Sequence, residues 1–131
     1  PAHGTLEIKA PQSFIFKGAP ALTQSDLHSL VGPEVDQYKK RKNKFQGTIH
    51  VLAEAKVSCA KSLGRQVTGL SDVIYGISPN GAGTISIGSM AWTSVGLRAH
   101  AITELGQFAR IVTTNILTAV LQGPLSKYEK I

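Results

Sequence analysis

The feature that most constrains the fold is a long alternation of apolar and polar residues. Between Ile49 and Cys59 every odd position is apolar, and four of the five even positions are polar, Leu52 being the exception. Successive side chains of a β-strand point to opposite faces, so this pattern predicts a strand with one face on a core and the other open. The Ala, Glu and Lys content makes a helix the competing interpretation. We prefer the strand because the period of two persists throughout the segment.

A β-hairpin is expected directly after this strand. The segments 66–68 and 72–78 are rich in residues typical of strands, and 84–88 is a further β run. The last two runs are separated by a loop that contains Pro79, Asn80 and Gly81. Because Asn and Gly tolerate the positive φ of hairpin turns, the loop predicts a turn between two antiparallel strands.

The first twenty residues also predict a hairpin. Residues 5–9 alternate between polar and apolar, and residues 13–17 are rich in aromatic and β-branched side chains, with Pro11 between the two runs. The following segment, 23–31, leaves two alternatives open. It is either a short helix capped by Thr23 or Ser25, or an irregular excursion that ends at Gly32 and Pro33.

The C-terminal region changes to a helical period. Apolar residues recur every three or four positions, at Ala101, Leu105, Phe108, Val112, Ile116 and Val120. Thr93 or Ser94 is expected to cap the start of this region, and Gly123 with Pro124 to end it. Gly106 within the stripe predicts either a break into two helices or the close approach of another backbone.

The helical region is more apolar than one contact surface requires. Ile102, Ala109, Leu117 and Leu121 widen the stripe, so we expect it to pack both on its own sheet and on a second copy. The predicted dimer and assembly surface consists of Leu97, Ala101, Leu105, Phe108, Val112, Ile116 and Val120.

Length and charge narrow the class of protein. The 131 residues fit one domain, with an N-terminal hairpin in 1–20, central strands in 45–92 and helices in 94–123. No apolar run reaches the roughly 18 residues that cross a bilayer, so we expect no membrane partner. The net charge is +6, and eight of the fourteen Lys and Arg residues but one of the eight acids lie in 39–65. This segment therefore carries +7 and the rest −1, which favours a polyanionic partner over a merely solvated loop.

The sequence contains no pattern typical of a catalytic or metal site. There is one cysteine, and the four histidines show neither a zinc-binding spacing nor a pairing with cysteine. The Gly-x-Ser-x-Gly motif of hydrolases is missing. We therefore predict that the protein is not an enzyme, and that it has no catalytic residue, no metal and no cofactor.

The alternating strand also defines a candidate nucleic-acid surface. His50, Lys56 and Ser58 fall on its polar face, where neighbouring side chains lie about 7 Å apart, near the phosphate spacing of an extended strand. Glu54 on the same face favours the competing interpretation of an ordinary solvated surface. The predicted RNA-binding residues are Lys39, Lys40, Arg41, Lys42, Lys44, His50, Lys56, Ser58, Lys61 and Arg65.

Three local patterns carry a family resemblance. The run from Arg41 to Phe45 (Arg-Lys-Asn-Lys-Phe) precedes the long strand, 84–87 (Thr-Ile-Ser-Ile) is followed by Trp92 and a helix, and 121–128 (Leu-Gln-Gly-Pro-Leu-Ser-Lys-Tyr) ends near a tyrosine. With a hairpin, central strands and C-terminal helices in that order, the chain resembles the coat proteins of single-stranded RNA bacteriophages.

The resemblance implies an α+β fold and a structural role in the virion. In that family the sheets of two subunits join into one surface, helices of each subunit lie across the other, and the opposite sheet face meets the RNA inside the shell. The implied partners are a second copy and the viral RNA, in a particle made in the host cytoplasm. The alternatives are a small dimeric nucleic-acid-binding module that forms no shell, and an enzyme whose site is assembled from dispersed residues.

Overall fold

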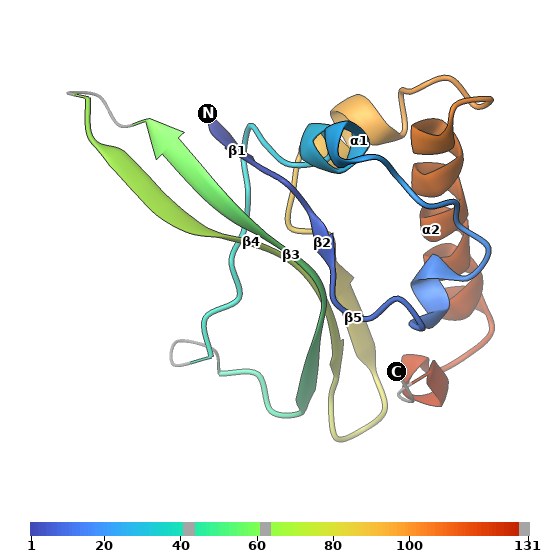
Figure 1. The fold of residues 1–131 in the computed structure, drawn as a ribbon. Coiled ribbons are helices and arrows are strands. Elements are labelled where there is room, and N and C mark those ends of the chain that lie inside the picture. Colours follow the sequence, from blue (N-terminus) through green and yellow to red (C-terminus); the bar gives the residue numbers. More distant parts are fainter. Residues whose placement is uncertain (41–43, 61–63, 129–131) are drawn as a thin grey trace.

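Two long antiparallel strands form the centre of a curled sheet (Figure 1). In the computed structural model, which describes residues 1–40, 44–60 and 64–128, β3 (Thr48–Ala60) pairs with β4 (Gln66–Ile77) along its length. On the outer sides, β5 (Gly83–Ser86) pairs with β4, whereas β1 (Ala2–Gly4) and β2 (Glu7–Ile8) pair with β3. The predicted strand over 49–59 is confirmed.

A β-bulge interrupts β3 at Leu52. Val51 lies opposite Ile74 and Ala53 lies opposite Val73, so Leu52 is an extra residue without a partner on β4. An extra residue in one strand exchanges the faces to which its odd and even positions point. The odd-numbered residues of β3 therefore point to one face of the sheet before Leu52 and to the other face after it.

The hairpin between β4 and β5 is confirmed by its turn. The Ser78 N–H donates to the Ala82 carbonyl at 2.8 Å, and the Gly81 N–H donates to the Ser78 carbonyl at 2.9 Å. The Asn80 side-chain oxygen accepts from the Ala82 N–H at 3.1 Å, and Gly81 has a φ of +86°. Asn80 and Gly81 thus supply the acceptor and the left-handed backbone that such a turn needs.

The predicted N-terminal hairpin is wrong. Of its two expected strands, 5–9 contributes β2, which pairs with β3, whereas 13–17 contains no strand and residues Phe14–Phe16 form a 3-10 helix, η1. The Asn115 side-chain amide donates to the carbonyls of Ile15 (3.0 Å) and Lys17 (2.9 Å), which fixes η1 against the C-terminal helix. Tertiary packing of the aromatic residues therefore overrides their local preference for a strand.

The region after η1 contains a short helix and then an extended segment. α1 (Gln24–Ser29) is capped by Thr23, whose hydroxyl accepts from the Asp26 N–H at 3.1 Å, so the helical alternative for 23–31 is correct. Residues 34–39, here named the strap, then run beside β4. The Asp36 N–H donates to the Gly88 carbonyl (2.9 Å), and the Asp72 N–H donates to the Asp36 carbonyl (3.1 Å).

The C-terminal helix begins later than predicted. Residues Trp92–Gly96 form a π-helical turn, η2, and α2 (Glu104–Leu121) starts only after its N-cap Thr103, whose hydroxyl accepts from the Gly106 N–H at 3.1 Å. A Cβ on Gly106 would lie 2.2 Å from the His100 carbonyl oxygen. Gly106 therefore marks a close backbone approach, which was one of its two predicted roles.

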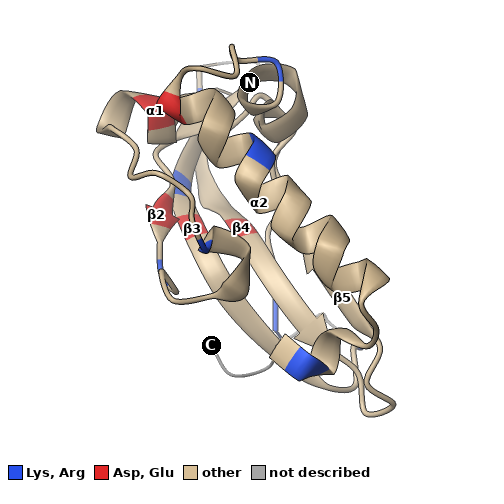
Figure 2. Ribbon diagram, turned by 90° about the vertical axis from the view of Figure 1, so that its right-hand side faces the viewer, with Lys and Arg blue, Asp and Glu red and all other residues tan. Residues whose placement is uncertain are grey.

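The core lies between α2 and one face of the sheet. Figure 1 shows α2 along one side of the sheet, and Figure 2 shows it crossing the strands obliquely. Buried Tyr75 and Val73 of β4 belong to the same core cluster as Phe108 and Val112 of α2. A short 3-10 helix, η3 (Leu125–Tyr128), follows and adds Leu125 to this core. The fold is thus α+β, as predicted.

Candidate nucleic-acid interface

The sheet face opposite α2 is accessible along the outer halves of β3 and β4, residues 56–60 and 66–70. Cross-strand partners point to the same face, which here pairs Lys56 with Leu70 and Ser58 with Thr68. His3 of β1 lies opposite Ser58, and the two side chains share a 3.2 Å hydrogen bond. A cation, two hydroxyls, an imidazole and an apolar side chain thus occur together. We refer to this surface as the open face.

A pocket of about 450 Å³ lies on the open face. It is lined by Lys56, Val57, Ser58, Thr68, Gly69 and Leu70. Single-stranded RNA is recognised where bases find an apolar wall and polar groups at their edges, and where cations meet the phosphates. Leu70, the two hydroxyls and Lys56 provide these three kinds of group within one pocket.

His50 does not belong to the open face, and the prediction that it shares a face with Lys56 and Ser58 is wrong. It lies opposite Tyr75, and the two rings stack with their centroids 5.9 Å apart. Tyr75 is buried on the core side, where its hydroxyl donates to the carbonyl of Leu125. The bulge at Leu52 is the physical reason, because it reverses the alternation between His50 and Lys56.

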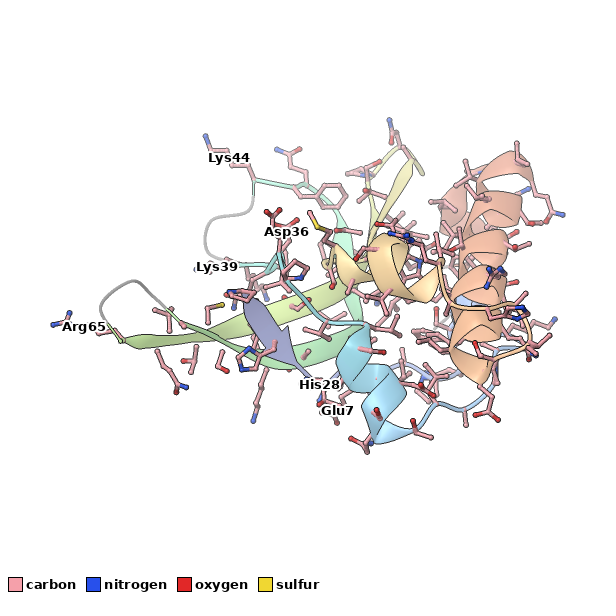
Figure 3. The ribbon with its side chains drawn as sticks, turned by 90° about the horizontal axis from the view of Figure 1, so that it is seen from above. Glu7, His28, Asp36, Lys39, Lys44 and Arg65 are labelled. Carbon is pink, nitrogen blue, oxygen red and sulfur yellow. The ribbon has the colours of Figure 1, made fainter. Side chains whose placement is uncertain are left out.

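Other predicted cations border the open face. Figure 3 shows Lys39, Lys44 and Arg65 on the side of the molecule away from α2. Lys39 belongs to the strap and Lys40 follows it directly. Lys44 precedes β3, and Arg65 lies between β3 and β4. Within the described part of the chain, none of these side chains forms a salt bridge. The remaining predicted cations, Arg41, Lys42 and Lys61, lie outside the described residues.

Three carboxylates cross the centre of the sheet in one row. Glu7 of β2 lies opposite Glu54 of β3, which in turn lies opposite Asp72 of β4. In Figure 2 one acidic segment is visible on each of these three neighbouring strands. Like charges directly opposite each other are unfavourable in a sheet. Sequence reasoning identified Glu54 alone, because the alignment of distant acids depends on the strand register.

Asp72 is the unusual member of this acidic row. Asp72 is only 4% exposed, and its Oδ2 accepts a 2.8 Å hydrogen bond from the Tyr38 N–H of the strap. Its Oδ1 is buried and has no hydrogen-bond partner. Burial raises the pKa of the Asp72 carboxyl above its ordinary value; the Tyr38 N–H opposes this rise and the Glu54 carboxylate adds to it.

The predicted assembly stripe faces mainly the chain's own core. Phe108 and Val112 are 4% and 0% exposed, and Leu97, Leu105 and Ile116 are partly buried against the same core. Their expected place on an outer surface is therefore corrected: the helix turns this stripe towards its own sheet. Ala101 is exposed in the turn before α2, and Val120 is 54% exposed. The large apolar side chains left exposed near and along α2 are Ile102, Leu117, Val120 and Leu121.

Two other kinds of functional feature, a metal-binding cluster and a membrane-spanning helix, are missing from the described residues. No group of three or more His, Cys, Asp or Glu in 1–40, 44–60 and 64–128 is arranged to hold a metal ion. None of the helices in these ranges combines the length and apolar character needed to cross a membrane. The open face and its bordering cations are therefore the strongest candidate for a functional surface.

Comparison with known proteins gives no match among protein-family models, curated proteins or solved structures.

Proposed function

We propose that this chain is a structural coat protein that dimerises, assembles into a shell and binds RNA through the open face of its sheet. One observation carries the proposal. The helices lie on one face of the sheet, whereas the opposite face presents Lys56, Ser58 and Thr68 around a pocket. This division of the sheet agrees with the use of the two faces in the coat proteins of single-stranded RNA bacteriophages, which the sequence resembles.

The chemistry of the open face favours single-stranded RNA over a double helix. An exposed base can make apolar contact with Leu70 while the hydroxyls of Ser58 and Thr68 form hydrogen bonds with its edge, and Lys56 then contacts the adjoining phosphate. Lys39, Lys40, Lys44 and Arg65 extend the cationic border of this surface. They supply the salt-dependent, sequence-independent part of binding.

The acidic row limits where the RNA backbone lies. Phosphates are repelled by the carboxylates of Glu7 and Glu54, which lie opposite each other in the middle of the sheet and are not buried. We therefore expect the RNA to contact the outer halves of β3 and β4 and the strap cations, rather than the whole sheet. This footprint is narrower than the basic sheet face expected from the sequence.

Two features support self-association. Leu117, Val120 and Leu121 form an exposed apolar group at the end of α2. Within the described residues, β5 pairs on one side only, and its sequence Gly-Thr-Ile-Ser contains neither the charges nor the proline that usually block an edge strand. Pairing of β5 with β5 of a second copy would join the two sheets into one.

Ultraviolet cross-linking of purified material tests the RNA contact directly. The proposal predicts cross-linked peptides from the outer halves of β3 and β4 and from the strap, and few from α2. Cross-links confined to α2 would contradict it. Negative-stain imaging of the same material separates the two nucleic-acid hypotheses, because a coat protein gives particles of uniform diameter and a non-assembling module gives small dimers.

A further inference from the structure

The strap is attached to the sheet chiefly at one carboxyl residue. The backbone N–H of Asp72 donates to the Asp36 carbonyl at 3.1 Å, and the Asp72 Oδ2 accepts from the Tyr38 N–H at 2.8 Å. The strap is also tied to the chain after β5, through Asp36 to Gly88 and through Met90 to Glu34. Two of these four hydrogen bonds therefore depend on Asp72.

The other oxygen of the same carboxyl group lacks a donor. Asp72 Oδ1 is buried and makes no hydrogen bond, although a buried polar oxygen normally has a partner. The residue directly across the strand pair is Glu54, a second acceptor when it is ionised. A single proton on the Asp72–Glu54 pair would give the unsatisfied oxygen a hydrogen bond and remove one of two adjacent charges.

The surrounding charges do not provide another compensating group for this pair. From β2, Glu7 faces Glu54, and its carboxylate forms a 3.0 Å salt bridge with Lys9. From the strap, Asp36 and Lys39 line the pocket beside Asp72; Asp36 is a further carboxylate, and among the described residues Lys39 forms no salt bridge with Asp72. On β3 the next cation along the face, Lys56, lies opposite Leu70 rather than Asp72. The neighbouring strand β5 contributes the uncharged Ser86.

We propose that Asp72 and Glu54 share one proton, and that this proton holds the strap against the sheet. In the closed state Asp72 Oδ1 carries the proton and donates it in a hydrogen bond to the Glu54 carboxylate. When the proton is lost to water, two carboxylates face each other and one of them is buried beneath the strap. Hydration of the Asp72 carboxylate then requires the strap to lift, which breaks its two bonds to Asp72.

This device would regulate the presentation of cations to RNA. Lys39 lies within the strap and Lys40 follows it directly, so lifting the strap moves both relative to the open face. The link to RNA rests on the proposed function, whereas the proton-dependent movement of the strap does not. The two can therefore fail separately.

Hydrogen exchange read by mass spectrometry tests the movement in the intact protein, whatever its state of assembly. The measured quantity is the protection of the peptide containing residues 34–39, corrected for the intrinsic pH dependence of amide exchange. In the natural chain, protection is expected to fall as the pH rises from mildly acidic to mildly alkaline. In Asp72→Asn, the amide replaces the shared proton as a donor to Glu54, so protection is expected to persist across the range.

Two further variants keep the test decisive if Asp72→Asn folds poorly. Glu54→Gln provides an N–H for Asp72 Oδ1 and is also expected to hold the strap closed at every pH. Asp36→Asn is the matched control, because this exposed strap carboxyl is outside the pair, and it should behave as the natural chain does. The proposal is overturned if strap protection in the natural chain follows only the intrinsic exchange rate, or if Glu54→Gln retains the full pH dependence. If the natural chain binds no RNA but its strap protection still depends on pH, the result would instead count against the proposed function.

Discussion

Ser58 of β3 and Thr68 of β4 are direct cross-strand partners on the sheet face opposite α2. Their hydroxyls lie between Lys56 and the outer end of the sheet, in the pocket that Leu70 also lines. This relationship connects residues ten positions apart in sequence through the strand register. It makes the pocket, rather than the basic segment as a whole, the most specific element of the proposed RNA surface.

Replacing Thr68 with Val should weaken RNA binding without disturbing the strand. The substitution removes the hydroxyl but keeps the β-branched shape, and one hydrogen bond contributes about 0.5–1.5 kcal/mol, or roughly a 2- to 10-fold change in affinity. Fluorescence anisotropy with a single-stranded RNA measures the effect. Thr114→Val, at an exposed position on α2, is the control and should leave affinity unchanged. Equal RNA affinities for Thr68→Val and Thr114→Val would show that the Thr68 hydroxyl does not contact RNA.

Replacing Lys56 with Gln should change the salt dependence of binding. Each phosphate contact that is lost reduces the slope of log affinity against log salt concentration by about 0.7 for a single strand. Lys17→Gln provides the control, because Lys17 follows η1 beside α2 and is exposed there. An unchanged slope for Lys56→Gln would show that this side chain contacts no phosphate.

Asp72→Asn should stabilise the fold at neutral pH. Because the pKa of Asp72 is raised in the folded chain, the folded state retains this proton at pH values where the unfolded state has lost it. The contribution of the Asp72 carboxyl to the free energy of unfolding therefore falls as the pH rises through that interval, and it stays low above it. The gain from Asn should be present at neutral pH and disappear in acid, as measured by chemical denaturation at several pH values. A variant less stable than the natural chain at neutral pH would contradict this sign.

Core and surface positions of α2 should respond differently to substitution. Phe108→Ala removes a buried aromatic side chain and should cost about 3–5 kcal/mol of unfolding free energy. Leu121→Gln, at a side chain that is 86% exposed, should change stability by no more than about 0.5 kcal/mol but reduce self-association. Thermal unfolding and sedimentation measure the two effects. Unaltered assembly of Leu121→Gln would exclude the end of α2 as a subunit contact.

Gly106→Ala should destabilise the chain although alanine favours helices. The gain in helix propensity is about 1 kcal/mol, but the new Cβ would lie 2.2 Å from the His100 carbonyl oxygen, which is a backbone atom. Gln107→Ala on the same helical turn is exposed and serves as the control. A more stable Gly106→Ala variant would mean that the turn before α2 relaxes away from the helix.

The sequence predicted elements whose signals are local. The alternation over 49–59, the Asn80–Gly81 turn and the Thr23 cap each depend on residues close together in the chain, and each is present. Leu52, the one apolar residue at an even position of the alternation, is the bulged residue. The break in the pattern was therefore a signal for the bulge, but the bulge alone decides that His50 faces the core.

What the sequence could not predict depends on long-range packing and register. The aromatic residues of 13–17 favour a strand locally, yet Asn115 and the core hold Phe14–Phe16 as a 3-10 helix. The acidic row joins Glu7, Glu54 and Asp72 from three separate strands, and no spacing along the chain indicates it. The apolar stripe of α2 is expected from its pattern to pack on its own sheet and on a second copy, and only the packed fold shows that Phe108 and Val112 are buried in the chain's own core.

The measurement that tests the central claim most directly is the mass of the purified protein, together with its nucleic-acid content after nuclease treatment. Analytical ultracentrifugation at neutral pH, with absorbance recorded for both protein and nucleic acid, provides both quantities. If the chain is an RNA-binding coat protein, we expect a large particle of uniform mass that retains protected RNA. A monomer free of nucleic acid would contradict it.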